Sequence, residues 1–187
     1  MGAAAGAALA LRPFSLAGQG LQGLQSATGD TFYFALIADS HRDIVANWPA
    51  ELPRGVIHAD LFPDNVFFIG NKVSGIIDFY FACTDFLAYD VAVTMNAWCF
   101  SEGEFNPAKA TALIANYQQS RALTKAEKDA FPILLRGAAL RFLLTRAHDM
   151  IFHEEGALVR PHDPLEYALK LRFHQQAHGA KTYGIDA

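Results

Sequence analysis

The chain has 187 residues, of which 52% are hydrophobic and 18% charged, and its formal net charge is −4. This length and apolar content are enough for one domain with a substantial core. The 15 basic residues are scattered along the chain, which argues against a nucleic-acid partner. Charged residues and glycines interrupt every apolar stretch before the roughly 20 residues of a membrane span, so no membrane anchoring is expected.

The N-terminal residues predict a lead-in rather than a signal sequence. Residues 3–11 favour a helix that ends before Pro13, but no basic residue precedes this apolar stretch, as a secretory signal would require. A connector rich in glycine, glutamine and serine follows from Gly18 to Gly29. Apolar residues then recur at helical spacing from Ser40 to Trp48, with Ser40 or Asp39 as a possible N-cap.

A pair of short strands is predicted in the middle of the chain. Val66–Ile69 and Val73–Ile77 are rich in residues that favour strands, and Gly70–Lys72 between them suits a tight hairpin loop. The pairing is therefore expected to be antiparallel. Asn65 and Asp78, which flank the two strands, should then lie at the same end of the pair.

Helices are predicted over most of the remaining sequence. Residues 85–100 are apolar almost all round, which is typical of a helix buried in a core. Three later helices are marked by their first residues: Asn106 before a proline, the capping box of Thr124 and Glu127, and Asp163 before a proline. They are expected to run to about residues 120, 154 and 178.

The residues that carry chemistry follow the spacing His58-x-Asp60-x4-Asn65, with Asp78 after the second strand. Phosphoryl transfer needs a carboxylate to orient the attacking hydroxyl and oxygen ligands for magnesium. Asp60 is the candidate base, and Asn65 and Asp78 are the candidate metal ligands. His58 is expected to pack under the loop and to bond to backbone. This pattern resembles the catalytic loop and metal-binding aspartate of protein-kinase-like phosphotransferases.

A second resemblance is narrower and covers roughly residues 49–178. The chain closely resembles bacterial homoserine kinases of the aminoglycoside-phosphotransferase-like type in the segments 52–68, 77–83, 88–90, 136–146, 163–167 and 171–174. This resemblance implies ATP-dependent phosphorylation of the homoserine hydroxyl in threonine biosynthesis, with ATP and Mg²⁺ as cofactors, in the cytoplasm.

The sequence departs from the kinase pattern before the catalytic loop. No lysine precedes Lys72, and Glu51 is the only glutamate before His58, so the lysine and glutamate pair that positions ATP in kinases has no counterpart upstream. Gly18, Gly20 and Gly23 match the letters of a kinase glycine-rich loop, but without flanking strands they are interpreted as a connector. No ATP-binding residue is therefore assigned.

The expected fold is α+β, namely the mostly helical C-terminal lobe of the protein-kinase-like fold. A short antiparallel hairpin is expected to carry the catalytic and metal residues, and the ATP-binding N-lobe is expected to be missing. The expected divisions are an altered lead-in over residues 1–48, the catalytic lobe over 49–178 and a tail over 179–187. Two alternatives stay open: a non-catalytic remnant or binding lobe, and another small-molecule kinase acting on an aminoglycoside, choline or a sugar-like alcohol.

The sequence leaves the roles of several other polar residues open. Asp90 is expected to act structurally, by capping a helix or bonding the catalytic loop, and a structural role is also favoured for Asp85 over contact with a substrate ammonium group. Three arginines, Arg136, Arg141 and Arg146, recur every five residues and should point in different directions around their helix. Any one of them could bind the homoserine carboxylate.

The remaining histidines and cysteines are interpreted without a metal site or a disulfide. His174 and His178 share a predicted helix face, and a surface pair is favoured over zinc binding because no third ligand is in view. Cys83 and Cys99 are flanked by aromatic and aliphatic residues and are expected to be buried thiols in a reducing compartment.

Overall fold

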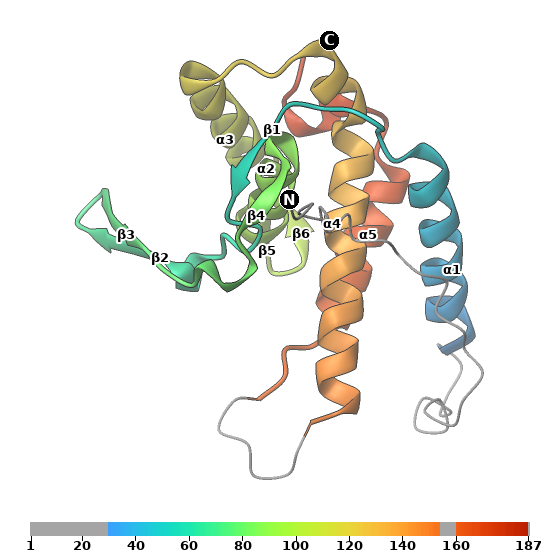
Figure 1. Ribbon diagram of the computed structural model, residues 1–187. Coiled ribbons are helices and arrows are strands. Elements are labelled where there is room, and N and C mark those ends of the chain that lie inside the picture. The colour runs from blue at the N-terminus through green and yellow to red at the C-terminus, as the bar shows by residue number, and fades with distance from the viewer. Residues whose placement is uncertain (1–29, 154–159, 187) are drawn as a thin grey trace, which may run out of the picture.

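The computed structural model describes residues 30–153 and 160–186, and Figure 1 shows their arrangement. The expected N-terminal helix and the Gly18–Gly29 connector lie outside the described residues. The helices are α1 (Asp30–Asn47), α2 (Leu87–Trp98), α3 (Pro107–Ser120), α4 (Lys125–Ile151) and α5 (Leu165–Gln176). The strands are β1 (Arg54–Ile57), β2 (Val66–Ile69), β3 (Lys72–Ile76), β4 (Cys83–Phe86), β5 (Phe100–Ser101) and β6 (Glu104–Phe105).

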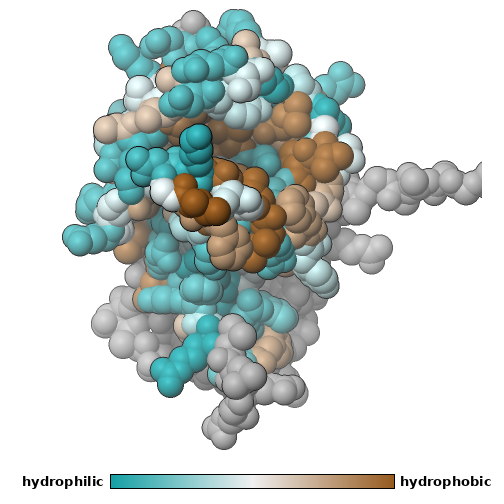
Figure 2. All heavy atoms as spheres, turned by 90° about the vertical axis from the view of Figure 1, so that its left-hand side faces the viewer, coloured by the Kyte–Doolittle hydropathy of each residue, from teal (hydrophilic) through white to brown (hydrophobic). Residues whose placement is uncertain are grey.

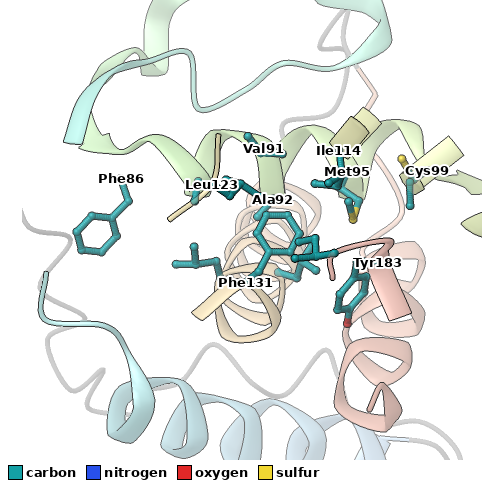
Figure 3. Close-up of a cluster of buried hydrophobic side chains, with 14 of the residues drawn as sticks. Phe86, Val91, Ala92, Met95, Cys99, Ile114, Leu123, Phe131 and Tyr183 are labelled. Carbon is teal, nitrogen blue, oxygen red and sulfur yellow. The ribbon is translucent and has the colours of Figure 1, made fainter. Parts of the chain in front are cut away.

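The long helix α4 is the element around which the other helices are arranged. Helices α1, α2 and α5 all pack against it, and Figure 1 shows α1 and α5 running alongside it. Two clusters of buried apolar side chains result. The cluster in Figure 3 joins α2, α3 and α4 through side chains such as Met95, Ile114 and Phe131, and the second joins α1, α4 and α5.

The predicted starts of α3 and α4 are confirmed. Asn106 caps α3 by accepting a hydrogen bond from the Lys109 amide at 3.1 Å. Thr124 and Glu127 form both bonds of the capping box of α4. Asp163 accepts the Leu165 amide at 2.8 Å beside the start of α5, which satisfies one of the donors left open at a helix N-terminus.

The described strands form three antiparallel two-stranded sheets, β1–β4, β2–β3 and β5–β6. The β2–β3 pairing is the one predicted, with Val66 opposite Ile76 and a register shift between Phe67 and Phe68. This hairpin projects from the helical body in Figure 1. Figure 2 looks onto the same side of the molecule, where apolar side chains of the hairpin are exposed, including Ile69 at 76%.

Three sequence-based interpretations of elements are wrong. Residues 85–100 are not one helix, because residues 83–86 pair with β1 as a strand before α2 begins. Ser40 does not cap a helix but lies inside α1, buried, where it accepts a hydrogen bond from Gln175 at 2.6 Å. Cys83 is exposed rather than buried, because it begins β4 at the end of a surface sheet of only two strands; Cys99 is buried as expected.

The last described residues pack against α3 and α4. Residues 180–183 form a short 3-10 helix, and Tyr183 and Ile185 are buried against the first core cluster. The Tyr183 hydroxyl lies 3.0 Å from Nδ1 of His174, whose Nε2 lies 2.8 Å from Oδ1 of Asn96.

His174 is therefore a buried core residue, and the expectation of a surface pair with His178 is wrong. α5 ends at Gln176, so His178 lies beyond the helix and is exposed. The apolar surroundings and the internal polar partners explain why His174 is inside.

Candidate active site

The candidate catalytic loop lies between β1 and β2 and is held in place by His58, one of its own residues. The Asp60 amide donates to Nδ1 of His58 at 3.3 Å, which assigns the proton of the neutral ring to Nε2. Nε2 then donates to the carbonyl of Ile77 at 2.9 Å. His58 is buried at 7% exposure, and the expectation that it packs under the loop and bonds to backbone is confirmed. The ring ties the loop to the segment that carries Asp78.

Asp90, in the first turn of α2, fixes the backbone of the same loop. Its carboxylate accepts the amide of His58 at 3.1 Å and the amide of Ala59 at 2.7 Å. Ala59 has φ 62°, a left-handed conformation that costs a non-glycine residue roughly 1–2 kcal/mol. The predicted bonding role of Asp90 is confirmed. Asp85 instead accepts the amide of the next residue, Phe86, at 2.8 Å, which supports the structural role.

Asn65 connects the candidate base with the start of the hairpin. Its Nδ2 donates to the Asp60 carbonyl at 2.8 Å and lies 3.3 Å from the Asp60 carboxylate oxygen Oδ2. The Ile77 amide donates to the Asn65 carbonyl at 3.0 Å, so Asn65 and Asp78 lie at the same end of the β2–β3 pair, as predicted. Asp78 is exposed and has φ 60°, which turns the chain out of β3.

The electrostatic surroundings of Asp60 suit a group that exchanges a proton. Partial burial raises the pKa of its carboxyl, and the nearby charge of Asp78 raises it further, while Arg141 opposes the shift. A carboxylate with a raised pKa is a better proton acceptor near neutral pH than an exposed one. The loop thus presents a half-buried carboxylate of increased basicity beside two oxygen-bearing side chains.

The chemistry of Asn65 and Asp78 fits magnesium. Because the Asn65 amide nitrogen is engaged by Asp60, its Oδ1 atom is the part of the side chain left to bind a cation. Mg²⁺ prefers oxygen donors and is usually held by one or two side chains together with substrate phosphates and water. The described residues contain no cluster of three or more His, Cys, Asp or Glu side chains that could hold a metal by themselves.

Arg141 on α4 is the residue at this site whose role the sequence left open. Its Nη1 donates to the carbonyl of Ala59 at 2.6 Å, and its guanidinium lies 5.1 Å from the centre of the Phe81 ring. The five-residue spacing predicted that the three arginines diverge, and this is confirmed: Arg136 pairs with Asp43 and Arg146 with Glu166. The spacing alone carried no signal that Arg141 would be the one beside Asp60.

The arrangement as a whole defines a class of protein. An aspartate in a tight loop, an asparagine five residues later and an aspartate across a short hairpin have the arrangement that is typical of the catalytic half of a kinase-type phosphotransferase site. Residues 7–123 match the phosphotransferase enzyme family, and the chain belongs to this family. Its fold is α+β and mostly helical, as expected.

Curated relatives of this chain carry the name homoserine kinase. The homoserine kinase of Xanthobacter autotrophicus is 62% identical over 81% of this chain and 47% of its own length. That of Brucella anthropi is 52% identical over 89% of this chain and 52% of its own length. The chain therefore spans about half the length of the curated relatives it matches.

A solved structure is also similar. An ethanolamine kinase of Plasmodium vivax matches with a TM-score of 0.48 and 15% identity, over 78% of this chain and 39% of that chain.

Among the helices within residues 30–153 and 160–186, none combines the length and the hydropathy needed to cross a membrane.

Proposed function

We propose that this chain takes part in the ATP-dependent phosphorylation of the homoserine hydroxyl, a step of threonine biosynthesis in the cytoplasm. The observation that carries the proposal is the joining of Asp60, Asn65 and the Asp78 segment by hydrogen bonds at one end of the hairpin. The relatives named homoserine kinase, at 52% to 62% identity, support homoserine as the acceptor.

In this proposal Asp60 orients the acceptor hydroxyl and takes its proton as the new oxygen–phosphorus bond forms and ADP leaves. Asn65, through Oδ1, and Asp78, through its carboxylate, would hold Mg²⁺. When bound, the metal supplies positive charge to the phosphate oxygens. The bonds from Asp90 and His58 keep the loop in place, so that Asp60 need not be reoriented during the reaction.

The proposal is tested by measuring ADP formation by the purified chain with Mg-ATP and a panel of acceptors: homoserine, choline, ethanolamine, an aminoglycoside and a sugar alcohol. Homoserine-dependent ADP formation, with phosphohomoserine as product, is the expected result. If the folded chain phosphorylates another acceptor but not homoserine, that acceptor takes the place of homoserine as the proposed substrate. A folded chain with no acceptor-dependent turnover would contradict the activity.

A second candidate is a non-catalytic lobe that binds a small amino acid or a partner. Within these 187 residues no lysine precedes Lys72, and a binding role, unlike phosphoryl transfer by these residues alone, does not need the lysine with which kinases hold the ATP phosphates. Calorimetry with Mg-ATP separates the two. Tight Mg-ATP binding by these 187 residues would exclude the non-catalytic lobe.

A further inference from the structure

The three arginines of α4 differ in whether a carboxylate pairs with the guanidinium. Arg136 donates to the Asp43 carboxylate at 2.6 Å, and Arg146 donates to the Glu166 carboxylate at 2.6 Å. Arg141 has only neutral neighbours at contact distance: the Ala59 carbonyl, the Tyr89 hydroxyl and two aromatic rings. Among the described residues, no carboxylate oxygen lies within the 4.0 Å ion-pair distance of Arg141.

Arg141 also packs against two aromatic rings and remains partly exposed. Its guanidinium lies 4.7 Å from the centre of the Phe142 ring and 5.1 Å from that of Phe81, and Phe81 is itself 48% exposed. Stacking on rings fixes the plane of a guanidinium and leaves its N–H edges available. Nη1 donates to the Ala59 carbonyl, and the Tyr89 hydroxyl is a second polar neighbour of the guanidinium, which has five N–H donors in all. The remaining donors form an unpaired cationic edge on a half-buried side chain.

The position of this edge relates it to the acceptor. Ala59 precedes Asp60, so a group bound at Arg141 is one residue along the loop from the candidate base. A small molecule whose hydroxyl is oriented by Asp60 would therefore have its other end within reach of Arg141.

We propose that Arg141 binds the α-carboxylate of an amino-acid acceptor whose hydroxyl is oriented by Asp60. This inference rests on the proposed function and identifies its acceptor class as hydroxy amino acids rather than amino alcohols. The planar fork of an arginine matches a carboxylate, and a fixed cation without an anionic partner gains from an anionic ligand. Asp60 itself is too far from Arg141 to form an ion pair.

Calorimetric binding of three compounds tests this assignment without requiring turnover. L-Homoserine carries both the carboxylate and the ammonium group, 3-amino-1-propanol lacks the carboxylate, and 4-hydroxybutyrate lacks the ammonium group. In the parent chain, homoserine should bind more tightly than 3-amino-1-propanol. The variant Arg141→Met should bind homoserine and 4-hydroxybutyrate about 10- to 100-fold more weakly than the parent, which is the usual effect of losing a hydrogen bond to a charged group. Its affinity for 3-amino-1-propanol should stay within about twofold of the parental value.

Arg146→Met is the matched control. Arg146 lies on the same helix, stacks on an aromatic ring at 4.5 Å and donates to a backbone carbonyl, but it already has a carboxylate partner. Its replacement should leave the ratio of the homoserine and 3-amino-1-propanol affinities unchanged. This ratio does not depend on the folded fraction of a variant. If Arg141→Met does not fold, Arg141→Lys, which keeps the charge without the fork, should still reduce the ratio.

Four results would overturn the inference. The first is no binding of homoserine by the parent, and the second is an unchanged ratio of the homoserine and 3-amino-1-propanol affinities in the Arg141 variants. The third is equally weakened binding of all three compounds, and the fourth is weakened binding of Mg-ATP with unchanged binding of homoserine. Carboxylate-selective binding without phosphoryl transfer would support the inference and count against the proposed function. Phosphoryl transfer to homoserine and to 3-amino-1-propanol without preference would support the proposed function and count against the inference.

Discussion

Replacing Asp90 by asparagine should destabilise the chain through the catalytic loop. The native carboxylate accepts two amides, from His58 at 3.1 Å and Ala59 at 2.7 Å, and so holds the left-handed Ala59 in place. An asparagine offers one acceptor oxygen and no negative charge. One amide then loses its partner and the other bond weakens, and bonds to charged groups contribute about 1.5–3 kcal/mol each. We expect the free energy of unfolding to fall by about 2–4 kcal/mol.

Urea unfolding followed by tryptophan fluorescence measures this loss. Trp98 is a local probe, because its indole nitrogen donates to the Leu61 carbonyl in the same loop at 2.9 Å. Asp85→Asn is the control: Asp85 accepts only the adjacent Phe86 amide, so its replacement should cost less than about 1 kcal/mol. A free energy of unfolding of Asp90→Asn within about 0.5 kcal/mol of the parent, or equal losses in the two variants, would contradict this anchoring role of Asp90.

Other residues give further predictions. Burial lowers the pKa of His174 to about 3, far below the roughly 6.5 of an unfolded histidine. In this pH range only the unfolded chain binds the proton, so the free energy of unfolding should fall by up to about 1.4 kcal/mol for each pH unit below pH 6.5. In His174→Gln the urea midpoint should depend less steeply on pH than in the parent. Thr124→Ala removes a helix cap and should lower the free energy of unfolding by about 1 kcal/mol. Glu127→Ala should lower it by about 3 kcal/mol, because the buried carboxylate also pairs with Arg121. Equal losses in thermal unfolding would contradict this ranking. Tyr167→Phe removes a buried hydroxyl without a hydrogen-bond partner among the described residues, so its melting temperature should equal or exceed that of the parent.

Local signals in the sequence were sufficient for the elements that depend on near neighbours. Asn106 and Thr124 specify helix starts through bonds to residues three positions away, and the glycine turn specifies the β2–β3 hairpin. The same hairpin brings Asn65 and Asp78 together, so this part of the candidate site follows from sequence.

Contacts between distant segments could not be predicted in the same way. β4 forms because residues 83–86 pair with β1 about thirty positions earlier. His174 is buried because Asn96 and Tyr183 meet its two nitrogens. Arg141 is set beside Ala59 by the packing of α4, which its spacing from Arg136 does not encode.

The most direct test of the account is the activity of Asp60→Asn with Mg-ATP and homoserine. An asparagine keeps the size of the side chain and an oxygen near Asn65, but it cannot take a proton. The parent should form phosphohomoserine, and Asp60→Asn should lower the rate by about 100-fold or more while the urea midpoint stays unchanged. A folded variant that phosphorylates homoserine at the parental rate would contradict the assignment of this loop as the catalytic centre.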